Sequence, residues 1–253
     1  MVRTEELHKI LNPKFSKWVT KDENGNIPIF GDQTSEVAGA LYTRSVRETG
    51  DEALMRAPYF SIAGFYAKIG AYIASTMKEG GVLYEVGCGL AIPSITYSKI
   101  TNNWAAAIDN NRREIKGARY LAERVNANNI DFIVCNGADI IEGKSSWFPW
   151  KDYSNTITPQ DTVLVLNPVD DHMDQILTNS NASNVIFVGG PGRLFGRHNH
   201  HTSSFSGPRE WIPWFIEQGL DKSLEAKGWN DILISGEYQD FFMPNMALVH
   251  LSR

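Results

Sequence analysis

The feature that most constrains the fold is the stretch from Gly81 to Gly89, which reads GVLYEVGCG. Residues 82–86 form a short apolar run typical of a buried strand, and alternating glycines at its end predict a tight turn. A helix is expected after Ala91, because Pro93 is tolerated in a first helical turn, where its missing N–H costs nothing. The stretch therefore predicts a strand, a glycine turn and a helix, with the carboxylate of Glu85 just ahead of the turn.

Beyond this stretch, strand and helix patterns alternate, which is typical of a parallel sheet with helices on both faces. Further strands are expected over 104–108, 131–135, 162–166 and 184–188, and the segments 231–238 and 246–252 are expected to pair as a closing antiparallel hairpin. Helices are expected over 5–11, 36–49, 58–77, 92–100, 112–126 and 208–227. Residues 1–79 are predicted to be an N-terminal helical cap that covers the substrate, and residues 80–253 to be the ligand-binding domain.

Composition narrows the class of protein. The chain has 253 residues, enough for one large α/β domain with an appendage, and its net charge of −5 disfavours a nucleic-acid partner. The two cysteines, Cys88 and Cys135, show no metal-binding spacing and indicate a reducing compartment. No apolar signal core or membrane span is found, so a cytoplasmic protein with no membrane association is expected. The oligomeric state is left open, with a homodimer as one option.

Acidic residues stand at the predicted ends of three consecutive strands: Glu85, Asp109 and Asp139. In an open parallel sheet, ligands bind outside these carboxyl ends. Asp109 is placed to accept hydrogen bonds from ribose hydroxyls, Asp139 from the amine of a base, and Glu85 favours a cationic group. A dinucleotide site would require a third glycine at position 92, where this chain has Ile92, and the negative charge of Glu85 would repel a pyrophosphate. S-adenosylmethionine, with a ribose diol, an adenine amine, an ammonium and a sulfonium, fits better.

These motifs resemble the class I S-adenosylmethionine-dependent methyltransferases. Residues 85–91 (EVGCGLA) are similar to the first motif of the family, with Ala91 in place of its third glycine, while 108–110 (IDN) and 137–139 (GAD) are similar to its ribose and adenine motifs. The resemblance covers roughly 80–253. It implies a Rossmann-like, mostly parallel seven-stranded sheet with an antiparallel final strand. The cofactor-binding residues that it implies are Glu85, Gly87, Cys88, Gly89, Asp109, Asn110, Ala138, Asp139 and Asn167.

The segment 167–170 (NPVD) is similar to the start of the Asn-Pro-Pro-aromatic motif of methyltransferases that act on planar or amide nitrogens. Val169 and Asp170 replace the second proline and the aromatic residue of that motif, and this departure disfavours a nucleobase substrate. Asn167 either lines the cofactor pocket or orients the substrate. The acidic cluster around Asp170 and His172 caps a helix, binds substrate or, by resemblance to catechol-type enzymes, binds a metal. We predict Asn167, Asp170 and His172 as the catalytic candidates, without a metal.

The substrate side is predicted from aromatic residues and histidines. Tyr59 and Tyr66 lie on the helix expected over 58–77, whose stripe of small residues suits close packing, so this helix either packs on the sheet or lines a ligand pocket. His198 and His200 lie in a long loop that is a surface loop, a cover with a general base or a metal site. These residues favour a small, partly apolar molecule, methylated at nitrogen or oxygen in a biosynthetic pathway. The alternatives are an RNA or protein methyltransferase, and a protein that binds S-adenosylmethionine without methylating.

Overall fold

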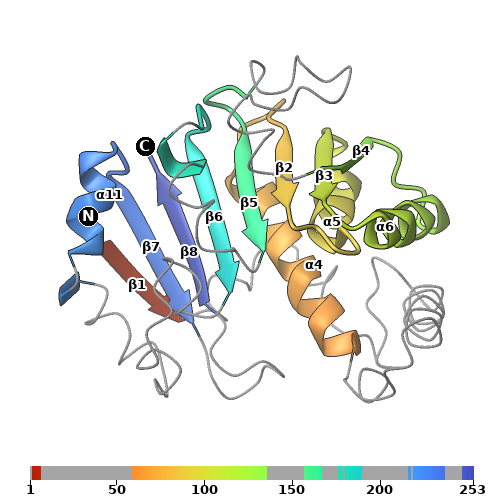
Figure 1. Ribbon diagram of the computed structural model, residues 1–253, viewed down its shortest axis with the longest axis horizontal. Helices are drawn as coiled ribbons and strands as arrows, with labels where there is room; N and C mark the ends of the chain where they lie inside the picture. Colours follow the sequence, from red (N-terminus) through yellow and green to blue (C-terminus); the bar gives the residue numbers. More distant parts are fainter. Residues whose placement is uncertain are drawn as a thin grey trace.

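The computed structural model describes residues 2–6, 59–135, 157–166, 176–178, 180–189, 216–217, 219–236 and 247–253. Within them, an eight-stranded sheet has the order β1-β7-β8-β6-β5-β2-β3-β4 (Figure 1). The strands are β1 Val2–Glu6, β2 Leu83–Val86, β3 Ala105–Asp109, β4 Ile130–Val134, β5 Thr162–Leu166, β6 Asn184–Gly189, β7 Asp231–Gly236 and β8 Ala247–Ser252. The helices are α4 Tyr59–Thr76, α5 Ile92–Thr101, α6 Arg112–Arg124 and α11 Leu220–Ala226.

Every neighbouring pair of strands is parallel except the two pairs that involve β8. The antiparallel β8 lies between β6 and β7, which confirms the predicted closing hairpin. The architecture is the Rossmann-like class I methyltransferase fold that the sequence predicts. The predicted bounds of β5 match the structure, those of β3 and β4 are each shifted by one residue, and β6 ends one residue later than predicted.

The first strand, β1, is a correction to the sequence prediction. Residues 5 and 6, expected to begin a helix, lie in a strand that extends the sheet from seven to eight strands. β1 pairs in parallel with β7, and Arg3 forms an ion pair with Asp231 in which the Nη2–Oδ2 distance is 2.7 Å. The helical pattern over 5–11 reflects only neighbouring residues, whereas the pairing of β1 depends on β7, which lies more than 220 residues away in the sequence. The helix expected over 36–49 lies outside the described residues.

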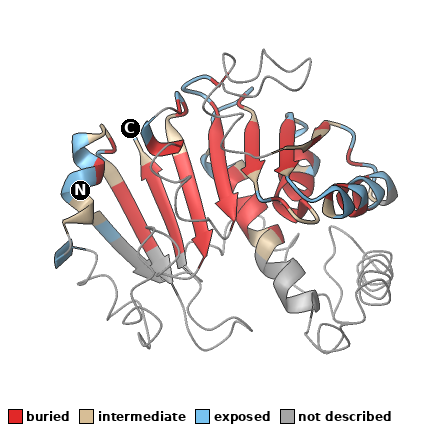
Figure 2. Ribbon diagram, in the orientation of Figure 1, coloured by how far each residue is buried: buried red, intermediate tan, exposed pale blue. Residues whose placement is uncertain are grey.

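The strands alternate their side chains between two apolar clusters, one on each face of the sheet. On one face, Leu83 and Ala107 pack with α4, α5 and α6, and on the other Tyr84 and Ala106 belong to the cluster that includes Leu224 of α11. Figure 2 shows the central strands buried along their length. Helices therefore cover both faces, as predicted.

Helices α4 and α5 pack closely because Gly70 has no side chain. A Cβ added at Gly70 would lie 2.5 Å from the carbonyl oxygen of Pro93 and 2.8 Å from the Cβ of Thr96. This agrees with the predicted stripe of small residues on α4. Helix α4, which belongs to the segment 1–79 expected to form the N-terminal cap, therefore packs in the core and holds the first turn of α5. The role of residues 1–79 in covering a substrate stays a prediction.

The strand order reverses between β2 and β5, which lie side by side although β3 and β4 separate them in the sequence. Such a switch point opens a crevice at the carboxyl ends of the two strands. Gly87 stands there with φ +71°, and a Cβ on it would lie 3.0 Å from the carbonyl oxygen of Leu166. Glycine is thus required at position 87 both by its backbone conformation and by the close approach of β5.

Candidate cofactor site

The turn after β2 is fixed by hydrogen bonds to β3. The N–H groups of Gly87 and Cys88 donate to the carbonyl oxygen of Ile108 at 2.9 and 3.0 Å, and the N–H of Gly89 donates to Asp109 Oδ2 at 2.9 Å. The side chain of Cys88 is 4% exposed and belongs to the apolar cluster of α4 and α5. Cys88, predicted as a cofactor-binding residue, can therefore offer only its backbone to a ligand.

Asp109 organises two elements at once. Besides Gly89, its carboxylate accepts the N–H of Asn111 through Oδ1 at 2.8 Å. Asn111 in turn caps α6, since its side-chain oxygen accepts the N–H of Arg113 at 3.0 Å. Each carboxylate oxygen can accept a second hydrogen bond, so Asp109 keeps acceptor capacity for hydroxyl groups. Asn110, another predicted cofactor residue, is exposed beside it.

Glu85 lies beneath the turn, with 0% of its surface exposed. Its Oε2 accepts the N–H of Ser94 at 2.9 Å and also a hydrogen bond from the Ser94 hydroxyl. Ala91 has no side chain with which to cap α5, so Glu85 satisfies an N–H of the first turn instead. Its Oε1 is buried and has no hydrogen-bond partner among the described residues. Burial raises the pKa of Glu85 to about 8, against the opposing effect of the Ser94 hydrogen bonds.

Glu114, in the first turn of α6, is a site residue that no sequence motif indicates. A Cβ added at Gly89 would lie 3.9 Å from Glu114 Oε2. Asn111 and Glu114 have the spacing of a capping box, in which the glutamate would accept the N–H of the capping residue. Asp109 already accepts that N–H, which leaves the Glu114 carboxylate free to face the turn. Burial, and then the charge of Asp109, raise the pKa of Glu114.

The turn is acidic and offers few free donors. Burial, and then the charges of Glu85, Asp109 and Glu114, raise the pKa of the Cys88 thiol, so this thiol is neutral. Five N–H groups between residues 87 and 94 already have acceptors within the chain: those of Gly87, Cys88, Gly89, Ala91 and Ser94. A pyrophosphate needs free N–H groups and positive charge, so this turn is unsuited to a dinucleotide. It suits a ligand with hydroxyl groups and positive charge.

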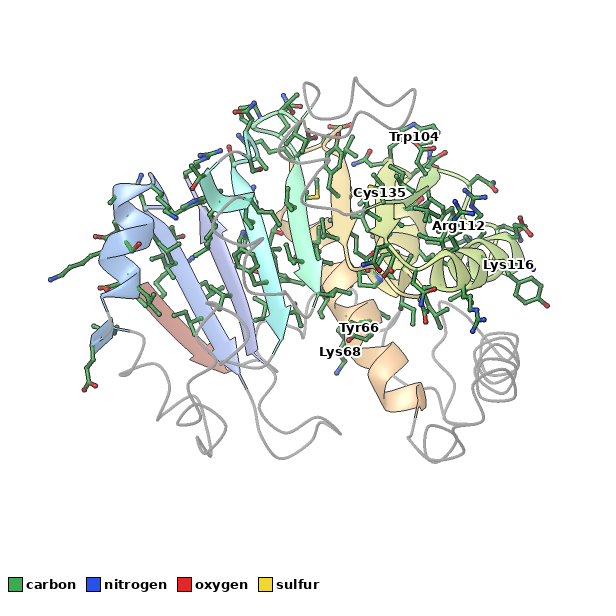
Figure 3. The ribbon with its side chains drawn as sticks, viewed as in Figure 1. Tyr66, Lys68, Trp104, Arg112, Lys116 and Cys135 are labelled. Atoms are coloured by element: carbon green, nitrogen blue, oxygen red, sulfur yellow. The ribbon has the colours of Figure 1, made fainter. Side chains whose placement is uncertain are left out.

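The other predicted site residues can be followed only in part. Tyr66 is half-buried and packs against the apolar cluster on the α4 face, near Lys68 on the same helix (Figure 3). The side chain of Tyr59 lies outside the described residues, as do Ala138, Asp139, Asn167, Asp170, His172, His198 and His200. The described residues include no group of three or more histidine, cysteine or acidic side chains that could hold a metal ion. The same residues contain no helix with the length and apolar character to cross a bilayer.

No family model and no curated protein matches the sequence. Among solved structures, the METTL16 methyltransferase domain is 11% identical, with coverage of 98% of this chain and 92% of that chain and a TM-score of 0.49. TrmK from M. capricolum, solved with S-adenosyl-homocysteine, is 16% identical; the match covers 72% of this chain and 66% of TrmK, with a TM-score of 0.42. Precorrin-6y C5,15-methyltransferase from Geobacter metallireducens is 12% identical; the match covers 74% of this chain and 86% of that enzyme, with a TM-score of 0.41. Likeness at this level assigns no activity, and the fold rests on the strand order itself.

Proposed function

We propose that the protein is an S-adenosylmethionine-dependent methyltransferase that acts on a nitrogen or oxygen of a small molecule. The observation that carries the proposal is the set of carboxylates from Glu85, Asp109 and Glu114 around the glycine turn, at the switch point of a class I methyltransferase sheet. Charged acceptors of this kind bind hydroxyl and ammonium donors strongly. S-adenosylmethionine carries both kinds of donor together with a sulfonium, so the residues present fit it.

S-adenosylmethionine supplies an activated methyl group, and the task of the chain is to bind, orient and exclude water. Asp109 would accept ribose hydroxyls through the lone pairs that the Gly89 and Asn111 amides leave free. Glu85 would offer Oε1 to a cationic donor. We extend the proposal to residues beyond the described part: Ala138 and Asp139 for adenine, Asn167 for cofactor or substrate, and Asp170 and His172 for orienting or deprotonating the acceptor. Tyr59, Tyr66, His198 and His200 are the proposed substrate contacts.

The acidic character of the chain supports a small acceptor. The net charge is −5, and the described carboxylates around the turn would repel a polyphosphate. One feature favours RNA as a second candidate substrate. Arg112 and Lys116, both labelled in Figure 3, are exposed at the start of α6 together with Arg113, directly after the Asp109 strand. RNA binding through these residues would weaken steeply with salt.

The test is transfer of a labelled methyl group from S-adenosylmethionine to separate pools of small amines and phenols, RNA and protein. The proposal predicts that S-adenosylhomocysteine accumulates with a small acceptor and that the rate depends little on salt. Label in RNA alone, lost at high salt and in Arg112→Ala, would favour the second candidate. Methylthioadenosine as the product would show transfer of the aminocarboxypropyl group and would contradict methyl transfer.

A further inference from the structure

The Glu85 carboxyl group is enclosed at the centre of the sheet. In register beside it lie Ala107 of β3 and Leu164 of β5, both apolar and 0% exposed. Ser94 donates two hydrogen bonds to Oε2, while Oε1 has no partner in the described part of the chain. An ionised carboxylate with one unsatisfied oxygen is costly in such surroundings, whereas a protonated carboxyl group loses much less on burial.

The charged groups around Glu85 do not compensate a negative charge there. Asp109 of β3 adds a repulsive negative charge, and Glu114 of α6 reaches the same turn. The first turn of α5 contributes the Ser94 hydrogen bonds and no charged side chain. On α4 the one charged residue is Lys68, which is half-buried and is not among the causes that shift the pKa of Glu85. The described surroundings are therefore polar on one side of the carboxyl group and apolar or negative on the others.

A cationic ligand in the crevice would supply the missing positive charge. We propose, on the basis of the proposed function, that Glu85 carries a proton in the ligand-free protein and releases it to solvent when S-adenosylmethionine binds. The O–H bond at the carboxyl group breaks, the proton passes to the buffer, and the remaining carboxylate faces the positive charge of the ligand. Glu85 is thus a positioning residue for the cofactor whose affinity is linked to pH.

The raised pKa of Glu85, about 8, is consistent with this geometry. At pH 7 a group with that pKa is protonated in about nine molecules out of ten. A positive charge within about 4–6 Å lowers a carboxyl pKa by roughly 1–3 units, which would leave between about half and nearly all of the Glu85 carboxyl groups ionised at pH 7. The expected release at pH 7 is therefore between about 0.4 and 0.9 proton for each ligand bound.

The test is calorimetric titration of S-adenosylmethionine into the full chain at pH 7, in two buffers that differ in ionisation enthalpy. The difference between the two binding enthalpies gives the number of protons exchanged. We expect release at pH 7 that falls toward zero by pH 9.5, where Glu85 is already ionised in the free protein.

Glu85→Gln keeps an oxygen acceptor for Ser94 and should abolish the release, while the exposed matched control Glu123→Gln should leave it unchanged. Because the ligand ammonium is the same in all titrations, the difference between wild type and Glu85→Gln isolates Glu85.

A second measurement does not depend on the ligand. Because the pKa of Glu85 is raised in the folded state, the contribution of Glu85 to the free energy of unfolding should fall as pH rises from 4.5 to 8. The difference in this free energy between wild type and Glu85→Gln should therefore fall over the same range, while the opposing titration of His250 is common to both proteins. Binding of S-adenosylmethionine without proton release, or full release in Glu85→Gln, would overturn the inference and leave the proposed function standing. Absence of binding would overturn the proposed function, and the unfolding measurement would still decide whether Glu85 holds a proton.

Discussion

At the scale of single residues, Asp109 combines a structural task with its expected ligand contact. Its two oxygens hold the N–H of Gly89 and the N–H that precedes α6, so the same carboxylate shapes the turn and starts the helix. The sequence predicts only the ribose contact, because the spacing to the glycines shows proximity and not hydrogen bonds. Loss of this carboxylate should therefore affect both stability and binding.

Asp109→Ala should lower the affinity for S-adenosylmethionine at least tenfold and reduce the free energy of unfolding by about 1–3 kcal/mol, because two amide donors lose their acceptor. Titration calorimetry and urea unfolding measure the two effects. Asp231→Asn is the matched control, since it weakens the exposed Arg3 ion pair at the far edge of the sheet. It should leave the affinity unchanged, and equal losses of affinity in both variants would contradict the assignment.

Ala91 stands where the motif that residues 85–91 resemble has its third glycine, and it keeps a backbone conformation that glycine adopts readily. Its φ is +54°, in the left-handed region, and the residue is fully buried. A β-branched side chain is disfavoured in that region and would overpack the site. We expect Ala91→Val to cost about 2–4 kcal/mol, whereas Ala91→Gly should change stability by less than about 1 kcal/mol because relief of strain offsets the lost methyl burial. Thermal unfolding of both variants measures this, and equal costs would contradict the conformational argument.

His250 gives the fold a pH dependence of its own. Its ring is hydrogen-bonded to the Tyr72 hydroxyl at 2.7 Å and to Asn184 Oδ1 at 3.0 Å. Burial lowers the pKa of His250 from 6.5 to about 4, so the unfolded chain binds a proton between these values and the folded chain does not. The contribution to stability is complete above pH 6.5 and is lost as pH falls toward 4.

The corresponding variant is His250→Gln, compared with wild type by urea unfolding at pH 7.5 and 5.0. When the pH is lowered from 7.5 to 5.0, the free energy of unfolding of the wild-type protein should fall by about 1–2 kcal/mol relative to that of the variant. The Glu85 carboxyl group acts in the opposite direction and is present in both proteins, so it cancels in the comparison. Identical losses in the two proteins would show that His250 does not titrate as its burial implies.

At the scale of elements, the contact between α4 and α5 positions the first turn of α5, which lies over Glu85. Gly70→Ala should cost about 1–3 kcal/mol because the added Cβ meets the backbone of Pro93, which cannot move aside without shifting the helix. The exposed Ser75→Ala on the same helix should be near neutral. Denaturant unfolding measures both, and a Gly70→Ala protein as stable as wild type would contradict the close packing.

Sequence patterns predicted those elements whose signal is local. The run 162–166, the glycine turn and Pro93 in the first turn of α5 all carry such signals, and the structure confirms them. The strand β1 was missed because its partner β7 lies at the other end of the chain. Glu114 was missed because its spacing from Asn111 resembles an ordinary helix cap, and only the hydrogen bond from Asn111 to Asp109 shows that the glutamate is free. The capping of α5 by Glu85 likewise depends on how a strand and a helix meet in space.

At the scale of the whole molecule, the fold places acidic side chains where a cofactor would bind. The carboxyl groups of Glu85, Asp109 and Glu114 come from β2, β3 and α6, and they meet at the glycine turn beside the switch point. The N-terminal part of the chain contributes an edge strand and a packing helix to the same sheet. We therefore expect the site to select a cofactor that carries positive charge and hydrogen-bond donors, and to bind dinucleotides poorly.

Titration of the full chain with S-adenosylmethionine and, in parallel, with NAD decides whether the acidic turn selects the cofactor. We expect saturable binding of S-adenosylmethionine, at least tenfold weaker in Asp109→Ala, and no binding of NAD under the same conditions. Binding of NAD with equal or greater affinity, or no binding of S-adenosylmethionine, would contradict this expectation.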